Sequence, residues 1–363
     1  MTIEYRSLES IDDLEKVADL EILVWGVQPR DAVPANLLHA MVNAGSLVVG
    51  AYDKNKLIGM ALMFPTDRNK HKRLWSHMAA VDPAYQSRGI GFEIKQFQRK
   101  WALKNGYLEI GWTFDPLQRG NANFNLHVLG GSTNIYHENF YGEMNDGINA
   151  GLPSDRVEVI WQLRNQRVKR LSEHKKPSSL LALSNISDEQ YLLKDSNNQP
   201  IYRELSPNQT VYLVEIPANI NALKRLSIDL ALAWQIALRN TFQTAFRSGY
   251  SAQDFILIDD HYCYVLVAEQ KWYLYVLECS DQTLYTGISP DVSQRILKHN
   301  KGQGAVYTKN RRPVTLLAAW QFPNRQAAMK AEIAFKRLQR QNKLDHIARK
   351  ENFRDAPFVD YAV

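Results

Sequence analysis

The stretch from Trp272 to Asn300 restricts the fold of this chain more than any other part of the sequence. Residues 272–278 alternate between the two faces expected of a strand, and residues 283–288 form a second short run of the same kind. The turn residues Asp281-Gln282 separate the two runs. A strand, a short polar turn and another strand predict a β-hairpin.

A helix is expected directly after this hairpin. Ser289-Pro290-Asp291 offers a hydroxyl for the cap, proline for the first helical position and an acid for the first turn. Arg295 and His299 follow on the expected helix and are four residues apart. Side chains at this spacing lie on the same face of a helix. The sequence therefore predicts a cation and an imidazole side by side.

These residue types suit the hydrolysis of a phosphodiester. That reaction needs a base for water, a cation at the phosphate and usually a metal ion that takes up developing charge. A tyrosine is a weak base at neutral pH unless a neighbouring Arg, His or metal lowers its pKa. Glu332 lies in an expected helix, residues 325–340, at the border of its apolar face. The candidate catalytic residues are Tyr275, Tyr285, Arg295, His299 and Glu332.

The same residues resemble the GIY-YIG nuclease superfamily. Its two tripeptides would correspond to Tyr273-Leu274-Tyr275 and Tyr285-Thr286-Gly287. The first tripeptide has Tyr273 where the family has glycine, and Thr286 is the middle residue of the second. Both variants are similar to those of the small single-domain bacterial branch, over residues 272–344. The resemblance implies a nuclease in which Glu332 holds Mg²⁺ or Mn²⁺.

The alternative for each residue taken alone is structural. Two strand tyrosines are more often packing residues, and an Arg/His pair at this spacing is usually a solvated helix face. The order of all five candidates over some sixty positions favours the nuclease.

The positive charge of the chain is concentrated in the same region. From Lys271 to Val363 there are 16 Lys and Arg against 8 Asp and Glu, whereas the whole chain has 44 against 38. A surplus of this kind favours a polyanion such as DNA, because phosphate contacts supply most of the affinity that is independent of base sequence. Solubility alone is the alternative. The candidates for DNA contacts are Lys298, Lys301, Lys309, Arg311 and Arg312.

The N-terminal segment contains a second candidate site. Residues 47–52 and 57–62 predict a strand pair, and a further strand, Leu74 to Val81, leads through a glycine-containing turn to an expected helix at 92–104. The strand expected at 108–113 comes next. A helix that starts from such a turn presents backbone N–H groups and a positive dipole end to a phosphate.

This turn resembles the acetyl-CoA pyrophosphate loop of the GNAT acetyltransferase superfamily. The family pattern is Gln or Arg, two residues, Gly, one residue, then Gly or Ala. The cofactor-binding residues implied by the resemblance are Val81, Gln86, Ser87, Arg88, Gly89, Ile90 and Gly91. The order of strands and helices around the loop is also that of the superfamily. The expected ligands are acetyl-CoA and an acceptor amine of unknown identity.

One catalytic feature of that superfamily is absent. GNAT enzymes commonly carry, after the fifth strand, a tyrosine that protonates the departing CoA thiolate, and residues 121–131 contain none. His127 and Tyr136 are the candidates to replace it, with packing or a solvated loop as the alternative for each. Residues 115–142 resemble a longer GNAT-like group for which no substrate can be named.

We expect a multidomain chain of α/β and α+β type. A GNAT-like mixed sheet with helices is expected at 1–165, a polar linker at 166–200 and an α/β extension at 201–269 that possibly completes the first sheet, with one long helix at 220–247. A small GIY-YIG nuclease domain of α/β type is expected at 270–363, with its core at 271–344. Two cysteines are too few for a disulfide framework, and neither a basic apolar leader nor a membrane-spanning stretch is present. We therefore expect a cytoplasmic protein with no membrane partner.

The function predicted from the sequence is a metal-dependent DNA endonuclease fused to an acetyl-CoA-dependent N-acetyltransferase. The alternative is an acetyltransferase that carries a nucleic-acid-binding module without cleavage.

Overall fold

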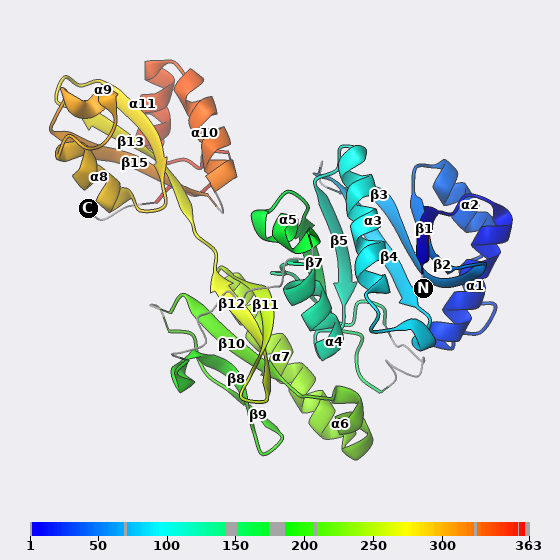
Figure 1. Cartoon of the computed structure of the whole chain (residues 1–363). Helices are drawn as coiled ribbons and strands as arrows, with labels where there is room; N and C mark the ends of the chain where they lie inside the picture. The colour runs from blue at the N-terminus through cyan, green and yellow to red at the C-terminus, as the bar shows by residue number, and fades with distance from the viewer. Residues whose placement is uncertain are drawn as a thin grey trace. The chain divides into compact units, whose positions relative to one another are not determined.

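The computed structural model describes residues 2–68, 71–142, 151–173, 186–206, 209–322, 325–354 and 356–359. The chain forms two compact units, Met1–Ala268 and Glu269–Val363. Figure 1 shows their elements along the chain, from blue at the N-terminus to red at the C-terminus. Within the described residues, no helix has both the length and the apolar character needed to cross a membrane.

The first unit begins with a seven-stranded sheet of order β1-β2-β3-β4-β5-β7-β6. Its strands are β1 (Ile3–Ser7), β2 (Leu47–Asp53), β3 (Lys56–Arg68), β4 (His71–Val81), β5 (Glu109–Phe114), β6 (Tyr136–His137) and β7 (Arg156–Gln162). Its helices are α1 (Ile11–Trp25), α2 (Ala35–Asn43), η1 (Pro83–Tyr85), α3 (Ile90–Lys104), α4 (Arg119–Ala122), the π-helical turn η2 (Asn123–Val128) and α5 (Gln166–Ser172). The predicted order of strand, glycine turn, helix and strand is confirmed by β4, η1, α3 and β5.

The two faces of this sheet follow the alternation of β2. Val48 and Tyr52 pack with residues of α1 and α2, whereas Val49 and Ala51 pack with residues of α3. All neighbouring strands pair antiparallel except β4 and β5. The parallel ladder between these two has only the pairs Leu74–Ile110 and Trp75–Gly111. Strand β4 continues to Val81, so its carboxyl end has no hydrogen-bonded neighbour on the β5 side.

The rest of the first unit is a five-stranded sheet of order β11-β12-β10-β8-β9. Its elements are η4 (Asp188–Gln190), β8 (Tyr191–Ser196), β9 (Gln199–Tyr202), β10 (Val211–Ile216), α6 (Ile220–Leu226), α7 (Ile228–Arg247), β11 (Tyr250–Ile258) and β12 (His261–Ala268). This segment does not add strands to the first sheet, because its own strands pair with one another, and only the isolated bridges Ser132–Ile160 and Thr133–Ala252 connect β7 to β11 among the described residues. The two sheets share one hydrophobic core, to which α7 contributes Trp234, Leu238 and Phe242.

Two further expectations for this region need correction. The helix expected at 220–247 is broken at Ser227, whose backbone is extended and whose hydroxyl accepts a hydrogen bond from Leu230 N. The polar linker expected at 166–200 contains α5 and β8, in which Val168, Leu171 and Leu193 are buried. The polar composition predicted a linker because α5 and β8 each bury only one face, so most of their residues are polar. Residues 174–185 of that range lie outside the described residues.

The second unit is a three-stranded antiparallel sheet of order β14-β13-β15 with helices on both faces. Its elements are β13 (Trp272–Cys279), β14 (Leu284–Ser289), α8 (Val292–Asn300), α9 (Val306–Lys309), β15 (Val314–Phe322), α10 (Arg325–Arg337) and α11 (Arg340–Arg349). Tyr275 and Leu277 of β13 pack with α8, whereas Leu274 and Val276 pack with α10. The predicted hairpin is confirmed. The helix expected at 325–340 ends at Arg337, and α11 begins after Gln339.

Candidate active site

The central strand of the second unit places Tyr275 against its neighbour β14. Tyr275 pairs with Gly287, and its side chain is fully buried. A Cβ atom added at Gly287 would lie 2.6 Å from Tyr275 Oη, which is too close for any side chain. The glycine of the second tripeptide therefore makes room for the hydroxyl of the first.

Helix α8 brings Arg295 and His299 to that hydroxyl, as their four-residue spacing predicts. Arg295 Nε donates to Tyr275 Oη at 3.4 Å, and His299 Nε2 lies 3.0 Å from the same oxygen. The helix start differs from the prediction by two residues. Asp291 is the cap and accepts a hydrogen bond from Gln294 N at 2.9 Å, while the Ser289 hydroxyl bonds to the backbone of Asp291.

A chain of hydrogen bonds fixes the imidazole of His299. The Thr308 hydroxyl donates to Ala305 O at 3.0 Å and lies 2.7 Å from His299 Nδ1. Because that hydroxyl proton is engaged, Nδ1 carries the proton and donates to Thr308, and Nε2 accepts from the Tyr275 hydroxyl. Thr308 was not a sequence candidate.

A glycine close to the ring makes this chain possible. A Cβ atom at Gly304 would lie 2.3 Å from His299 Nδ1, so the loop between α8 and α9 can cross the ring only with glycine there. Gly304 and Thr308 lie within nine residues of His299, and the short segment of glycines and hydroxyls after the helix is the signal that would have found them.

Burial sets the protonation states of the inner residues. Burial raises the pKa of Tyr275 to about 12, although the hydrogen bond from Arg295 acts in the opposite direction. Burial lowers the pKa of His299 to about 4, and the charge of Arg295 adds to the effect. Both groups are therefore neutral at pH 7. A lowered pKa, which a tyrosine base requires, is therefore not found at Tyr275, because the loss of hydration outweighs the effect of Arg295.

The expected contact of His299 with a phosphate is also corrected. Its side chain has no exposed surface, and both ring nitrogens are bonded within the protein. Tyr285 and Arg295, in contrast, are partly exposed. The ring of Tyr285 lies 6.3 Å from that of Tyr275, 5.0 Å from that of His299 and 6.0 Å from that of Tyr307. Tyr285 is thus the tyrosine of the pair that solvent reaches.

The candidate metal residue, Glu332, is not joined to this cluster by any hydrogen bond or ion pair among the described residues. It lies on α10, and its carboxylate accepts from Lys336 Nζ at 2.7 Å. Among all the residues that the structure describes, no group of three or more His, Cys, Asp and Glu side chains is arranged to hold a metal ion. One carboxylate suits Mg²⁺, which keeps several waters and takes further oxygens from a substrate phosphate.

A positively charged hollow adjoins Arg295. Its wall includes Arg295 and Lys298 from α8, Trp272 from β13 and Arg325 from the start of α10, with one carboxylate, that of the helix cap Asp291. The guanidinium of Arg325 lies 5.5 Å from the centre of the Trp272 ring. Arg325 was missed in the sequence because no spacing rule relates the start of α10 to α8. Glu332 follows Arg325 by seven residues, so the two lie on the same stripe of α10.

The other expected DNA contacts differ in their surroundings. Lys301 and Lys309 are exposed. Arg311 Nε donates to Asp281 Oδ2 at 2.8 Å, and the guanidinium of Arg311 lies 4.3 Å from the ring centre of Tyr307. Arg312 donates to Lys309 O at 2.8 Å and to Asn300 O at 3.3 Å. Both arginines therefore stabilise the loops around α9.

The N-terminal loop has the geometry expected for an anion site. Ser87 and Gly89 have φ angles of 61° and 80°, and Gly89 caps α3 without a side-chain hydrogen bond to the first turn. The amide Nε2 of Gln86 donates to Val81 O at 3.1 Å, and Arg88 donates to Ala84 O at 2.9 Å. A Cβ atom at Gly91 would meet Phe124 and Val81 only at ordinary contact distances. The protein itself therefore does not exclude a side chain at Gly91, and at Gly89 an added Cβ atom would meet nothing within 4 Å.

The two candidates for the missing tyrosine have different environments. The Tyr136 hydroxyl donates to Asp155 at 2.7 Å, and burial followed by the charge of Asp155 raises the pKa of Tyr136 far above its ordinary value. Such a phenol holds its proton too tightly to donate it. His127 Nδ1 lies 2.8 Å from Asp254 Oδ1, and the ring is partly exposed. His127 thus remains a candidate for this role, and the raised pKa argues against Tyr136.

Comparison with known protein families identifies two domains in the chain. Residues 271–345 match the GIY-YIG catalytic domain, and residues 13–127 match the acetyltransferase (GNAT) family. The first unit of the chain therefore contains a GNAT domain and the second a GIY-YIG nuclease-type domain. Both are domains of enzyme families.

The second unit has short bacterial relatives. A UPF0213 protein of Streptococcus sanguinis (strain SK36) is 53% identical over 79 residues, which are 22% of this chain and 91% of that protein. A UPF0213 protein of Cupriavidus pinatubonensis is 43% identical over 83 residues, 23% of this chain and 92% of that protein. The chain thus belongs to the GIY-YIG family through a C-terminal domain of the UPF0213 type.

Solved structures resemble the first unit. An N-acetyltransferase of Staphylococcus aureus Mu50 has 19% sequence identity and a TM-score of 0.36. The match covers 46% of this chain and 100% of that structure.

Proposed function

We propose that residues 270–363 hydrolyse phosphodiester bonds of DNA with Mg²⁺ or Mn²⁺ as cofactor. The strongest support is the solvent-facing side of the cluster that Tyr275, Tyr285, Arg295 and His299 form. Tyr285 and Arg295 are partly exposed there, and Arg295 shares the wall of a hollow with Lys298 and Arg325. Three cations against the single carboxylate of Asp291 in one hollow favour a phosphate backbone.

The residues divide into two groups in this proposal. Arg295 binds the scissile phosphate, and Tyr285 orients the attacking water through its hydroxyl. Tyr275, His299 and Thr308 hold Arg295 and the ring of Tyr285 from behind. Since Tyr275 is buried and its pKa is about 12, it positions Arg295 through its hydroxyl and does not act as the base.

Glu332 is the proposed metal ligand. A divalent cation held there supplies charge to the phosphate oxygens of the transition state. For this role the carboxylate must leave Lys336. An exposed ion pair at this spacing contributes only about 0.3–0.5 kcal/mol, so a divalent cation displaces the lysine at small cost.

Cleavage of supercoiled plasmid tests the nuclease proposal. We expect the purified full chain to convert supercoiled DNA to the nicked or linear form with Mg²⁺ or Mn²⁺, and a chelator to stop the reaction. Retention of DNA on a gel without cleavage under either metal would instead favour a binding module attached to a working acetyltransferase.

We further propose that the first unit binds acetyl-CoA and transfers the acetyl group to an amine. The loop from Gln86 to Gly91 supports binding of the pyrophosphate, because Gly89 starts α3 without a side-chain cap and a Cβ atom added at Gly89 would meet nothing within 4 Å. The carboxyl end of β4, which β5 does not pair, supports binding of the extended arm of CoA through backbone hydrogen bonds.

Thermal unfolding tests the cofactor. A ligand at a hundred times its dissociation constant adds about 2.7 kcal/mol to the free energy of unfolding, or several degrees in melting temperature. Gly91→Glu brings negative charge to the phosphate position and should abolish the shift. Lys100→Glu places the same charge more than two turns along α3 and should keep it. A wild type that does not respond to millimolar acetyl-CoA would contradict the proposal.

A further inference from the structure

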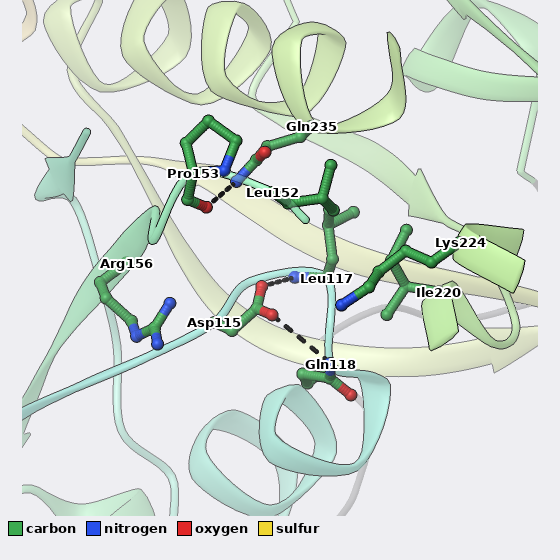
Figure 2. Close-up of a pocket in the computed structure, with 9 residues that line it drawn as sticks. All are labelled: Asp115, Leu117, Gln118, Leu152, Pro153, Arg156, Ile220, Lys224 and Gln235. Atoms are coloured by element: carbon green, nitrogen blue, oxygen red, sulfur yellow. Dashed lines mark hydrogen bonds between the residues drawn. The ribbon is translucent and has the colours of Figure 1, made fainter. Parts of the chain in front are cut away.

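The polar cavity beside β5, at the carboxyl end of that strand, has room for one water molecule only. Figure 2 shows its wall, to which Asp115 comes from the segment after β5, Arg156 from the start of β7, Lys224 from α6 and Gln235 from α7. Gln235 Nε2 donates to Pro153 O at 2.6 Å, and Oε1 is buried without a hydrogen-bond partner among the described residues. A buried water supplies such an acceptor with a donor. This cavity therefore connects the first sheet to α6 and α7 and offers no space for a substrate.

The surface around α9 in the second unit is open and lies next to the candidate active site. Thr308 is fully buried and lies 2.7 Å from His299 Nδ1, which attaches α9 to the cluster. The preceding residue, Tyr307, has its ring centre 6.0 Å from that of Tyr285, at an interplanar angle of 31°. Because solvent reaches Tyr285, a substrate that binds there also meets α9.

The exposed side of α9 is apolar and aromatic. Val306 is 92% exposed, more than any other large hydrophobic side chain that the structure describes, and Tyr307 is 42% exposed. Arg311 holds Tyr307 in place, since its guanidinium lies 4.3 Å from the ring centre and its Nη1 donates to Tyr307 O at 2.8 Å. A single exposed apolar side chain is common on protein surfaces. A fixed aromatic ring beside it, at the edge of a phosphodiester site, instead matches the platforms on which single-stranded DNA stacks its bases.

Positive charge adjoins this apolar surface. A hollow of about 640 Å³ at the C-terminal end of α9 has no carboxylate in its wall among the described residues, and the wall consists of Asn300, Lys309, Asn310, Arg312 and Pro313. Lys309 is exposed, and Arg312 donates to two backbone carbonyls, which do not neutralise its charge. An aromatic and apolar surface next to cations suits a ligand that has both flat rings and phosphates. Unpaired DNA offers this combination, whereas a duplex encloses its bases.

We propose that α9 binds an unpaired nucleotide of the DNA, whose base stacks against Val306 and Tyr307 and whose phosphate lies toward Lys309. This inference rests on the nuclease function proposed above and names its substrate class, which is DNA with an unpaired nucleotide next to the cleaved bond. The duplex part follows the hollow beside Arg295. In a continuous duplex the neighbouring bases cover each base, so Val306 would face only sugars and phosphates. Stacking on an aromatic side chain accepts any base, so the preference is for DNA structure and not for base sequence.

The affinities of two matched DNAs for the full chain test the substrate class. One DNA is a continuous duplex, and the other is the same duplex with a short unpaired loop in one strand. Fluorescence anisotropy in the presence of a chelator measures binding without metal-dependent cleavage. We expect the looped DNA to bind about ten-fold more tightly or better, because stacking of a base on an aromatic side chain has an effect of this size. Equal affinity for the two DNAs would overturn the proposal.

Two variants connect this preference to α9. Tyr307→Ala should weaken binding of the looped DNA about ten-fold and Val306→Ser about three-fold. Neither changes a charge, so duplex affinity and the salt slope should stay as in the wild type, whereas Lys309→Met should lower the salt slope for looped DNA by about 0.7. Ile333→Ser is the matched control, because Ile333 is 53% exposed on α10, which packs on the other face of the sheet. An equal loss in Ile333→Ser, or a preference that survives in both α9 variants, would reject the role of α9.

The substrate class and the nuclease function fail in different ways. Cleavage of plasmid together with equal binding of duplex and looped DNA leaves the nuclease proposal standing and rejects the role of α9. A preference for looped DNA that Tyr307→Ala removes, without cleavage under either metal, retains α9 as a nucleotide-binding surface and rejects only the cleavage. A chain that binds neither DNA contradicts both proposals.

Discussion

The two units build their candidate sites in different ways. In the second unit, Tyr275, Arg295, His299 and Thr308 lie within 34 positions and meet through side-chain hydrogen bonds of 2.7–3.4 Å. In the first unit, the phosphate loop consists mainly of backbone, and the cavity beside β5 gathers residues from the first sheet and from helices α6 and α7. A compact side-chain cluster is visible in a sequence, whereas a site made from backbone or distant segments is visible only in part.

Burial marks a second contrast, within the second unit. Tyr275 and His299 are fully buried and neutral, whereas Tyr285 and Arg295 reach solvent. In the function proposed above, the inner residues determine shape and stability, and the outer ones contact DNA. Variants of the two layers should give different phenotypes, and the following predictions test that difference.

Replacement of the metal ligand should have the largest effect. Glu332→Gln should lower the cleavage rate by about a thousand-fold or more, because it removes the carboxylate that holds the cation. Gel retention of DNA and the unfolding free energy should change little. Lys336→Met breaks the same ion pair but keeps the carboxylate, and it should retain cleavage. Normal cleavage by Glu332→Gln would exclude this residue as the ligand.

The outer arginine should come next. Arg295→Lys keeps the charge but loses the planar guanidinium, so the single-turnover cleavage rate should fall by about a hundred-fold. Melting temperature should stay within a few degrees, since Arg295 is partly exposed. A large loss of stability with normal cleavage would instead assign Arg295 to the inner layer.

The inner histidine should show itself in the pH dependence of stability. The folded pKa of His299 is about 4, below the ordinary 6.5, so its contribution is complete above pH 6.5 and is lost as pH falls toward 4. The loss amounts to about 2–3 kcal/mol. Urea unfolding of the full chain and of His299→Gln, followed by a probe in the second unit, should differ in pH slope between pH 4 and 6.5. Equal slopes would contradict the buried neutral imidazole.

Substitutions of Lys298 and Arg325 in the hollow beside Arg295 should have the smallest effects on DNA binding. Lys298→Met and Arg325→Met should each weaken DNA binding and reduce the salt slope of the logarithm of affinity by about one. Arg311→Met is the comparison, because Arg311 is paired with Asp281 and should change the slope less. A larger change for Arg311 would place the DNA path over α9.

Much of the tyrosine, arginine and histidine cluster of the second unit could be predicted from the sequence, but little of the cavity beside β5 could. The alternation of β13, the glycine at 287 and the four-residue spacing of Arg295 and His299 are local patterns, so their meeting was predictable. The roles of Thr308 and Gly304 depend on how a loop returns to the ring. The burial that opposes a lowered pKa at Tyr275 depends on packing against α8. Neither follows from spacing.

The first unit shows the same limit more strongly. The turn from Gln86 to Gly91 was visible because three neighbouring elements carry it. The meeting of Asp115, Arg156 and Gln235 depends on the packing of one sheet against another. The sequence predicts a linker at α5 and β8 because these elements bury few apolar residues. A helix or strand that buries only a few apolar residues on one face shows a weak periodicity of apolar residues in the sequence.

The two tyrosines test the central claim most directly. The single-turnover rate of plasmid nicking and the unfolding free energy should be measured for Tyr275→Phe and Tyr285→Phe under the same metal. We expect Tyr285→Phe to lose about a hundred-fold or more in rate with nearly unchanged stability. We expect Tyr275→Phe to lose about 1–3 kcal/mol of stability, because His299 Nε2 is left buried without a donor, and to nick DNA faster than Tyr285→Phe. The reverse pattern, normal nicking by Tyr285→Phe and none by folded Tyr275→Phe, would contradict the division into an outer catalytic and an inner structural layer.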